Sequence, residues 1–75
     1  MKERLPILKA RDVIKVLRKL GFHEVRQKGA HVCFKNYDGR FTLVPIHGGE
    51  DISRGLLRQI LREIEITPED FSKYL

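Results

Sequence analysis

The chain has 75 residues, a length that suits one compact domain and leaves little room for a deep small-molecule pocket. The formal net charge is +5, and residues 1–31 carry nine Lys and Arg against three Asp and Glu. This excess of positive charge favours a polyanionic or acidic partner, although a solvated helix face would give the same excess. A single cysteine excludes an intramolecular disulfide, and the chain shows neither a signal peptide nor a membrane span, so we expect a cytoplasmic protein.

Residues 10–20 show apolar side chains at helical spacing with charged residues between them, which predicts an amphipathic helix. Gly21 ends this helix, because glycine readily adopts the left-handed backbone angles of a C-cap. Lys9 is a poor N-cap, so the start of the helix is less well defined than its end. The predicted buried face consists of Ala10, Val13, Ile14, Val16, Leu17 and Leu20.

Three short strands are expected at residues 22–27, 30–36 and 40–46. Asp38-Gly39 favours a two-residue hairpin turn between the second and third strands. Counting outward from that turn places His31 opposite Ile46, and Pro45 indicates that the third strand lies at an edge of the sheet. On this register one face carries Val32, Phe34, Phe41 and Leu43 as the core, and the other carries His31, Cys33, Lys35, Thr42, Val44 and Ile46.

A second amphipathic helix is expected to begin near Asp51 or Ser53, either of which could cap it. Arg54, Arg58 and Arg62 recur every four residues and predict a basic ridge along this helix. A short third helix begins at Thr67-Pro68, a capping residue followed by a proline at the first helical position. The apolar stripe of the second helix consists of Leu56, Leu57, Ile60, Leu61 and Ile64.

The elements together predict an α+β domain of order α-β-β-β-α with a short C-terminal helix. Helices pack on one face of a three-stranded antiparallel sheet, and the opposite face is open. The predicted register places His31 on that open face, where it could exchange a proton with a ligand near neutral pH. Lys28 would add positive charge beside it, and Gly29 would allow a ligand backbone to come close.

Other roles for His31 stay open at this point, because a histidine in a strand can also belong to the core. A metal site could use His31, Cys33 and His47, but their spacing lacks the paired ligands of known zinc sites. A nucleophilic role for Cys33 lacks a nearby basic group that would lower the pKa of the thiol.

The chain resembles the HicA-type toxins, which are small mRNA interferases of bacterial and archaeal toxin–antitoxin systems. The motifs that carry the resemblance cover nearly the whole chain: L-P at 5–6, L-G-F at 20–22, Q-K-G-A-H at 27–31, D-G at 38–39, V-P-I-H at 44–47 and G-x-L-x-x-I-L at 55–61.

The resemblance implies a double-stranded-RNA-binding-domain-like fold over residues 1–75 and cleavage of mRNA without a metal or other cofactor. It also implies a HicB-type antitoxin that covers the sheet face containing His31. The family's catalytic histidine falls on His31, and its second recurrent histidine falls on His47. Ala30 stands where the family commonly has serine, so no hydroxyl can orient the imidazole from that position.

RNA contacts are expected from Lys28, Gly29, His47, Arg54 and Arg58, because cations neutralise phosphates and supply salt-dependent affinity. Two alternatives to the nuclease remain. The chain could be a non-catalytic module that binds duplex RNA by its shape. It could also be an interaction protein whose open face docks a partner such as an antitoxin.

Overall fold

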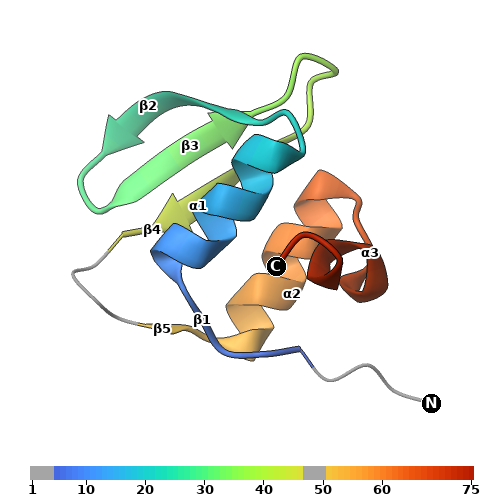
Figure 1. Ribbon diagram of the computed structural model, residues 1–75. Coiled ribbons are helices and arrows are strands. Elements are labelled where there is room, and N and C mark those ends of the chain that lie inside the picture. Colours follow the sequence, from blue (N-terminus) through green and yellow to red (C-terminus); the bar gives the residue numbers. More distant parts are fainter. Residues whose placement is uncertain (1–4, 47–50) are drawn as a thin grey trace.

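The computed structural model describes residues 5–46 and 51–75. Figure 1 shows the two longer helices on one side of a three-stranded antiparallel sheet, with a short helix beyond them. This is the predicted α+β arrangement, extended by a two-stranded pairing of β1 with β5. The elements are β1 (Leu8–Lys9), α1 (Ala10–Lys19), β2 (His23–Lys28), β3 (His31–Lys35), β4 (Phe41–Pro45), β5 (Asp51–Ile52), α2 (Arg54–Ile64) and α3 (Pro68–Ser72).

Helix α1 begins immediately after Lys9, although lysine is a poor N-cap. The carboxylate of Asp12, in the first turn, accepts the backbone N–H of Lys9 at 3.1 Å, so an acidic side chain inside the helix supplies the capping contact. The predicted end is confirmed, since Gly21 has φ of +93° and the N–H of Phe22 donates to the carbonyl of Leu17 at 2.9 Å.

The strands of the sheet lie in the order β2-β3-β4, so β4 is an edge strand, as Pro45 predicted. A two-residue turn at Gly29-Ala30 joins β2 to β3 and pairs Lys28 with His31. Gly29 has φ of +60°, whereas Ala30 has a negative φ, the combination that a type II′ hairpin turn requires. The glycine is therefore explained by the turn itself.

The predicted two-residue turn between β3 and β4 is wrong, because the loop contains three residues, Tyr37 to Gly39. The backbone N–H of Asn36 donates to the carbonyl of Arg40 at 2.8 Å, so these two residues close the loop. Gly39 alone has a positive φ, +100°, whereas a type I′ turn would need one at Asp38 also. The Asp38 carboxylate stabilises the loop by accepting the backbone N–H of Arg40 at 3.0 Å.

The longer loop shifts the pairing of β3 with β4 by one residue, and every side chain of β4 changes face. Thr42 and Val44, expected on the open face, lie under the helices with 1% and 0% of their surface exposed. Phe41 and Leu43, expected in the core, lie on the open face with 56% and 50% exposed. The faces of β3 are as predicted, and Val32 and Phe34 are buried.

Strand β2 contains an irregularity at Val25. Glu24 pairs with Phe34 and Arg26 pairs with Cys33, so Val25 is an extra residue without its own partner in β3. Glu24 therefore faces the helices, where its carboxylate lies 4.0 Å from the Arg18 guanidinium, while Arg26 faces the open side.

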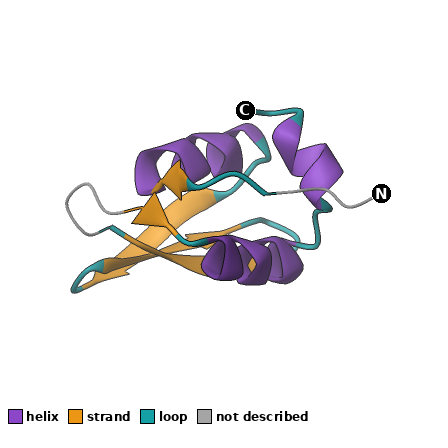
Figure 2. Ribbon diagram, turned by 90° about the horizontal axis from the view of Figure 1, so that it is seen from below, coloured by secondary structure: helices purple, strands orange, loops and turns teal. Residues whose placement is uncertain are grey.

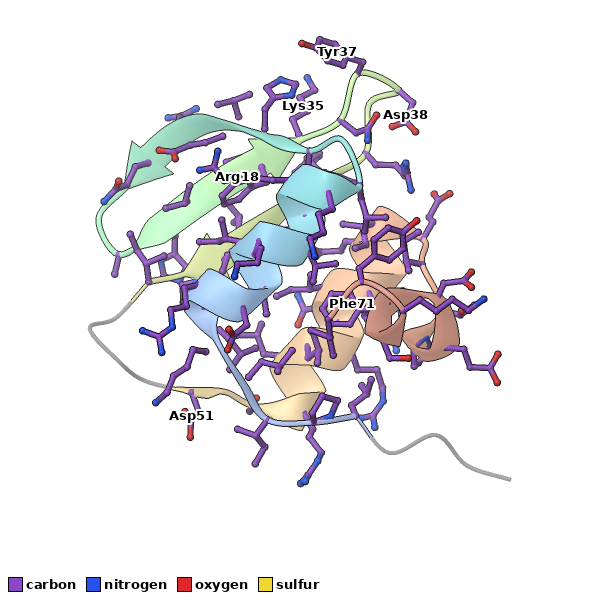
Figure 3. The ribbon with its side chains drawn as sticks, in the orientation of Figure 1. Arg18, Lys35, Tyr37, Asp38, Asp51 and Phe71 are labelled. Carbon is purple, nitrogen blue, oxygen red and sulfur yellow. The ribbon has the colours of Figure 1, made fainter. Side chains whose placement is uncertain are left out.

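The C-terminal helices follow the predicted pattern. Ser53, rather than Asp51, caps α2 by accepting the N–H of Leu56 at 3.1 Å, and Thr67 caps α3 by accepting the N–H of Asp70 at 3.1 Å. Phe71 of α3 is fully buried, and Figure 3 shows its ring directed toward the interior. The core comprises Leu5, Val13, Val16, Leu17, Phe22, Val32, Phe34, Val44, Ile52, Leu57, Ile60, Leu61, Ile64 and Phe71.

The side of the sheet away from α1 is not covered by any described element, as the view in Figure 2 shows. We call this surface the open face. Of the helices that the structure describes, none combines the length and the apolar character needed to cross a membrane.

Candidate active site on the open face of the sheet

His31 is the first residue of β3, and its side chain is exposed on the open face. The predicted orientation is therefore confirmed, and the alternative of a core histidine is excluded. Lys28 of β2 lies directly opposite His31 on one side, and Pro45 of β4 lies opposite it on the other. Directly opposed residues of an antiparallel pair share a face, so a cation and an imidazole are neighbours on one surface.

Two hollows meet at His31. The larger one, of about 600 Å³, lies on the sheet and is lined by Arg26, Lys28, His31, Cys33 and Leu43. The smaller one, of about 240 Å³, lies between the open face and α2, where Leu56, Gln59, Ile60 and Glu63 join His31, Leu43 and Pro45. A ligand in either hollow would therefore contact the imidazole.

The open face consists of three cross-strand rows, each with one Lys or Arg. The rows are Lys28–His31–Pro45, Arg26–Cys33–Leu43 and His23–Lys35–Phe41. None of the open-face positions in these strands is acidic, and within residues 5–46 and 51–75 none of the three cations forms an ion pair. Tyr37 lies at the hairpin tip (Figure 3). Its ring extends this face, because it lies 4.8 Å from the ring of His23.

The predicted site residues separate into two groups. Lys28 and the turn residue Gly29 adjoin His31, as expected. Arg54 and Arg58 do not, because Arg58 lies two residues from Leu56 and from Ile60 and so projects from a different side of α2 than the hollow beside His31. The Arg54 guanidinium instead donates to the backbone carbonyl of Leu5 at 2.6 Å, which ties the N-terminal segment to α2. His47 falls outside the described residues.

The sequence reasoning missed several residues that line the hollows. Arg26 would have been found from a two-residue turn at Gly29-Ala30, which places it opposite Cys33. Leu43 was assigned to the core through the incorrect loop length. Glu63 was missed although it lines the smaller hollow, where its carboxylate accepts the buried Thr42 hydroxyl at 2.6 Å. No periodic signal in the sequence distinguishes it from other exposed helix residues.

Candidate metal ligands do not gather in the part of the chain that the structure describes, where no group of three or more His, Cys, Asp or Glu side chains is placed to hold an ion. Cys33 is a half-buried free thiol in the middle row, and Leu43 lies opposite it.

The fold and the site together define a small α+β protein with an exposed histidine among cations on an open sheet. A family model described as the HicA toxin of bacterial toxin–antitoxin systems matches residues 10–66, which include every element of the three-stranded sheet. The chain belongs to this HicA toxin family. Its members are generally ribonucleases that are paired with a cognate antitoxin. A search of curated proteins gives no match.

Proposed function

We propose that this chain is an mRNA interferase, an endoribonuclease that cleaves cytoplasmic mRNA without a metal ion, and that His31 is its general acid–base residue. The observation that carries the proposal is the position of His31, exposed on the open face at the junction of two hollows and directly opposite Lys28. Membership of a family of ribonuclease toxins supplies the substrate class.

The proposed reaction needs a proton acceptor, a proton donor and positive charge near one phosphodiester. The imidazole of His31 takes the proton from a ribose 2′-hydroxyl, or returns one to the leaving 5′-oxygen. The attacking 2′-oxygen forms a bond to phosphorus as the bond to the 5′-oxygen breaks, which leaves a 2′,3′-cyclic phosphate and a 5′-hydroxyl end. The Lys28 ammonium stabilises the charge that develops on the phosphoryl oxygens.

The other residues that are expected to contact RNA differ in how close they lie to His31. Gly29 borders the site through the turn that sets Lys28 opposite His31. His47 is proposed as a second phosphate contact or acid–base group. Arg54 and Arg58 lie away from the hollows, so they would contact only RNA that extends past α2. Ala30 offers no hydroxyl beside His31, which we expect to lower the rate of cleavage below that of a serine-containing relative.

A HicB-type antitoxin is proposed to cover the open face and His31 with it. Phe41 and Leu43 expose about half of their surface there, and such apolar surface commonly marks an interaction site. Covering these side chains would remove apolar surface from water and block access to the imidazole at the same time. Addition of the antitoxin should therefore stop cleavage by the wild-type protein.

The test compares wild-type protein with His31→Ala on labelled mRNA in the presence of EDTA. We expect wild-type protein to generate new 5′-hydroxyl ends, and we expect the variant to cleave about 10²- to 10⁴-fold more slowly, the usual contribution of one acid–base group. Because His31 is exposed, the circular dichroism spectrum and the urea unfolding midpoint of the His31→Ala protein should match those of the wild type.

His23→Ala is the matched control, since His23 lies on the same face in the row farthest from His31. This variant should retain most of the wild-type rate. Cleavage by His31→Ala at that rate would remove His31 from the mechanism. Reversible binding of RNA by wild-type protein without any new ends would instead support a non-catalytic binding module.

A further inference from the structure

The open face carries two stripes of different chemistry, which we call the cationic line and the apolar shelf. The cationic line runs from Lys28 and Arg26 on β2 to Lys35 on β3, and the apolar shelf consists of Pro45, Leu43 and Phe41 along β4. Each cross-strand row contributes one residue to each stripe. Successive rows are two residues apart along a strand, about 6.6–6.8 Å, so the three rows extend over roughly 13 Å.

We propose that this face binds an extended single strand of RNA, with phosphates along the cationic line and a base stacked on the ring of Phe41. The inference rests on the proposed function, in which RNA is the substrate, and it specifies the form of that RNA. The scissile phosphate lies at the His31 end of the face, and the neighbouring nucleotides extend across Leu43 toward Phe41.

The pairing of the two stripes favours a single strand over a duplex. A single strand presents charged phosphates along one edge and the faces of its bases along the other. In an A-form duplex the bases are stacked inside the helix, and the protein meets phosphates and 2′-hydroxyls. An apolar shelf beside the cations would contact nothing suitable on a duplex, whereas it matches the bases of an unpaired strand.

The exposure of the shelf has no explanation in the fold. Phe41 is 56% exposed and Leu43 is 50% exposed, although the same strand buries Thr42 completely beneath the helices. The proposed antitoxin would cover the same apolar surface when it inhibits the protein, and the charge of the face shows what the free surface can bind. The open-face positions of β2, β3 and β4 include three cations and no carboxylate, as expected for a surface that follows a phosphate backbone.

The larger hollow connects the stripes to the proposed chemistry. Arg26 and Lys28 from the cationic line and Leu43 from the shelf line it together with His31. A nucleotide in this hollow would have its phosphate beside the cations and its base against Leu43, while the imidazole remains within the same space. The next base would then reach Phe41 in the adjacent row.

The test measures binding rather than cleavage, in the His31→Ala protein, by fluorescence anisotropy with three labelled RNAs. These are a short single strand, the same strand annealed to its complement, and the same strand with abasic riboses. We expect the single strand to bind more tightly than both others. Phe41→Ala should weaken binding of the single strand by about 5- to 150-fold, the effect of losing one stacked base. Phe41→Trp should preserve it.

One control variant is paired with a substitution in the apolar shelf, and another is paired with a substitution in the cationic line. Ile7→Ala removes an apolar side chain of similar exposure, 51%, outside the open face, and should leave binding unchanged. Arg26→Ala should lower the slope of log affinity against log salt by about 0.7, the value for one phosphate contact in a single strand, whereas Lys15→Ala on α1 should not.

The proposal is overturned if the duplex or the abasic strand binds as tightly as the intact single strand, or if Phe41→Ala binds normally. It is also overturned if the face binds an acidic protein but no RNA. The proposed nuclease activity can fail separately. If wild-type protein binds the single strand but does not cleave it, the nuclease proposal is refuted and the binding role of the apolar shelf is retained. If wild-type protein cleaves RNA and Phe41→Ala binds it normally, only the binding role of the shelf is refuted.

Discussion

The two faces of the three-stranded sheet use alternate residues of the same strands, yet one stabilises the fold and the other carries the proposed active site. Toward the helices lie Val32, Phe34 and Val44, all nearly inaccessible, with Thr42 as a polar member whose hydroxyl donates to Glu63. Toward solvent lie the proposed catalytic histidine, three cations and an apolar shelf. In a chain this small, a candidate functional surface can therefore be the reverse side of the core.

The largest expected difference between the faces concerns two phenylalanines. Phe34→Ala removes a fully buried ring and should lower the free energy of unfolding by about 3–5 kcal/mol. That is a large part of the roughly 4–11 kcal/mol expected for a domain of this size. Phe41→Ala, on the exposed shelf, should change it by about 0.5 kcal/mol or less. Urea unfolding followed by circular dichroism measures both, and similar losses would contradict the assignment of faces.

A disulfide can test the register that separates the faces. Cys33 lies opposite Leu43, at a non-hydrogen-bonded position of the ladder where Cα atoms are about 4.5 Å apart, within the range that disulfides tolerate. Under oxidising conditions, the cysteine introduced by Leu43→Cys should therefore form a disulfide with Cys33. The free energy of unfolding should rise by roughly 2–3 kcal/mol, as expected for a short closed loop.

Val44→Cys is the control for this cross-link, because its side chain faces the helices and Cys33 does not. Non-reducing electrophoresis and mass spectrometry identify the bonded form in each variant. Efficient cross-linking of Val44→Cys, with none in Leu43→Cys, would restore the register of a two-residue turn.

The smallest expected effect lies in the loop that sets this register. The backbone N–H of Arg40 lowers the pKa of Asp38 below its ordinary value; burial opposes this shift, and the Arg40 guanidinium reinforces it. Because the folded pKa is the lower one, the ionised carboxylate stabilises the fold above the unfolded pKa of about 3.9, and this contribution is lost as pH falls through the folded pKa.

Thermal unfolding at a series of pH values measures this contribution. Wild-type protein should be more stable than Asp38→Asn above roughly pH 5, and the difference should shrink as acid protonates Asp38. A difference that stays constant down to about pH 2 would show that the carboxylate charge does not stabilise the loop.

The sequence predicted the order of the three helices and of the three strands of the larger sheet, but not the short strands β1 and β5. Both faces of β3 were predicted although the register used to count them was wrong, because Val32 and Phe34 alternate with the residues of the open face. Strand β4 was ambiguous. In F-T-L-V-P both sets of alternate positions contain apolar residues, so their assignment depended on the length of the preceding loop. Asp38-Gly39 suggested two loop residues, but Asp38 uses its carboxylate to cap Arg40 instead of adopting a positive φ. The longer loop that results shifts the register by one residue and exchanges the two faces of β4.

The candidate site was predicted in part for the same reasons. His31 was identified from the sequence by counting along the second predicted strand, and Lys28 was identified as a cation three residues before it. Arg26 could not be assigned to their face without the register of the first hairpin. Glu63 enters the site through the placement of α2 beside β4, a tertiary arrangement that no local pattern encodes.

The unpaired Val25 has a consequence for the electrostatics of the open face. If β2 ran without this bulge, the turn at Gly29-Ala30 would place Val25 opposite Phe34 and Glu24 opposite Lys35, so a carboxylate would neutralise the third cation. One additional residue turns that acid toward α1 and leaves the open-face positions of β2, β3 and β4 without a carboxylate. In this strand an additional residue, and not the choice of a side chain, determines how strong a positive field an approaching polyanion meets.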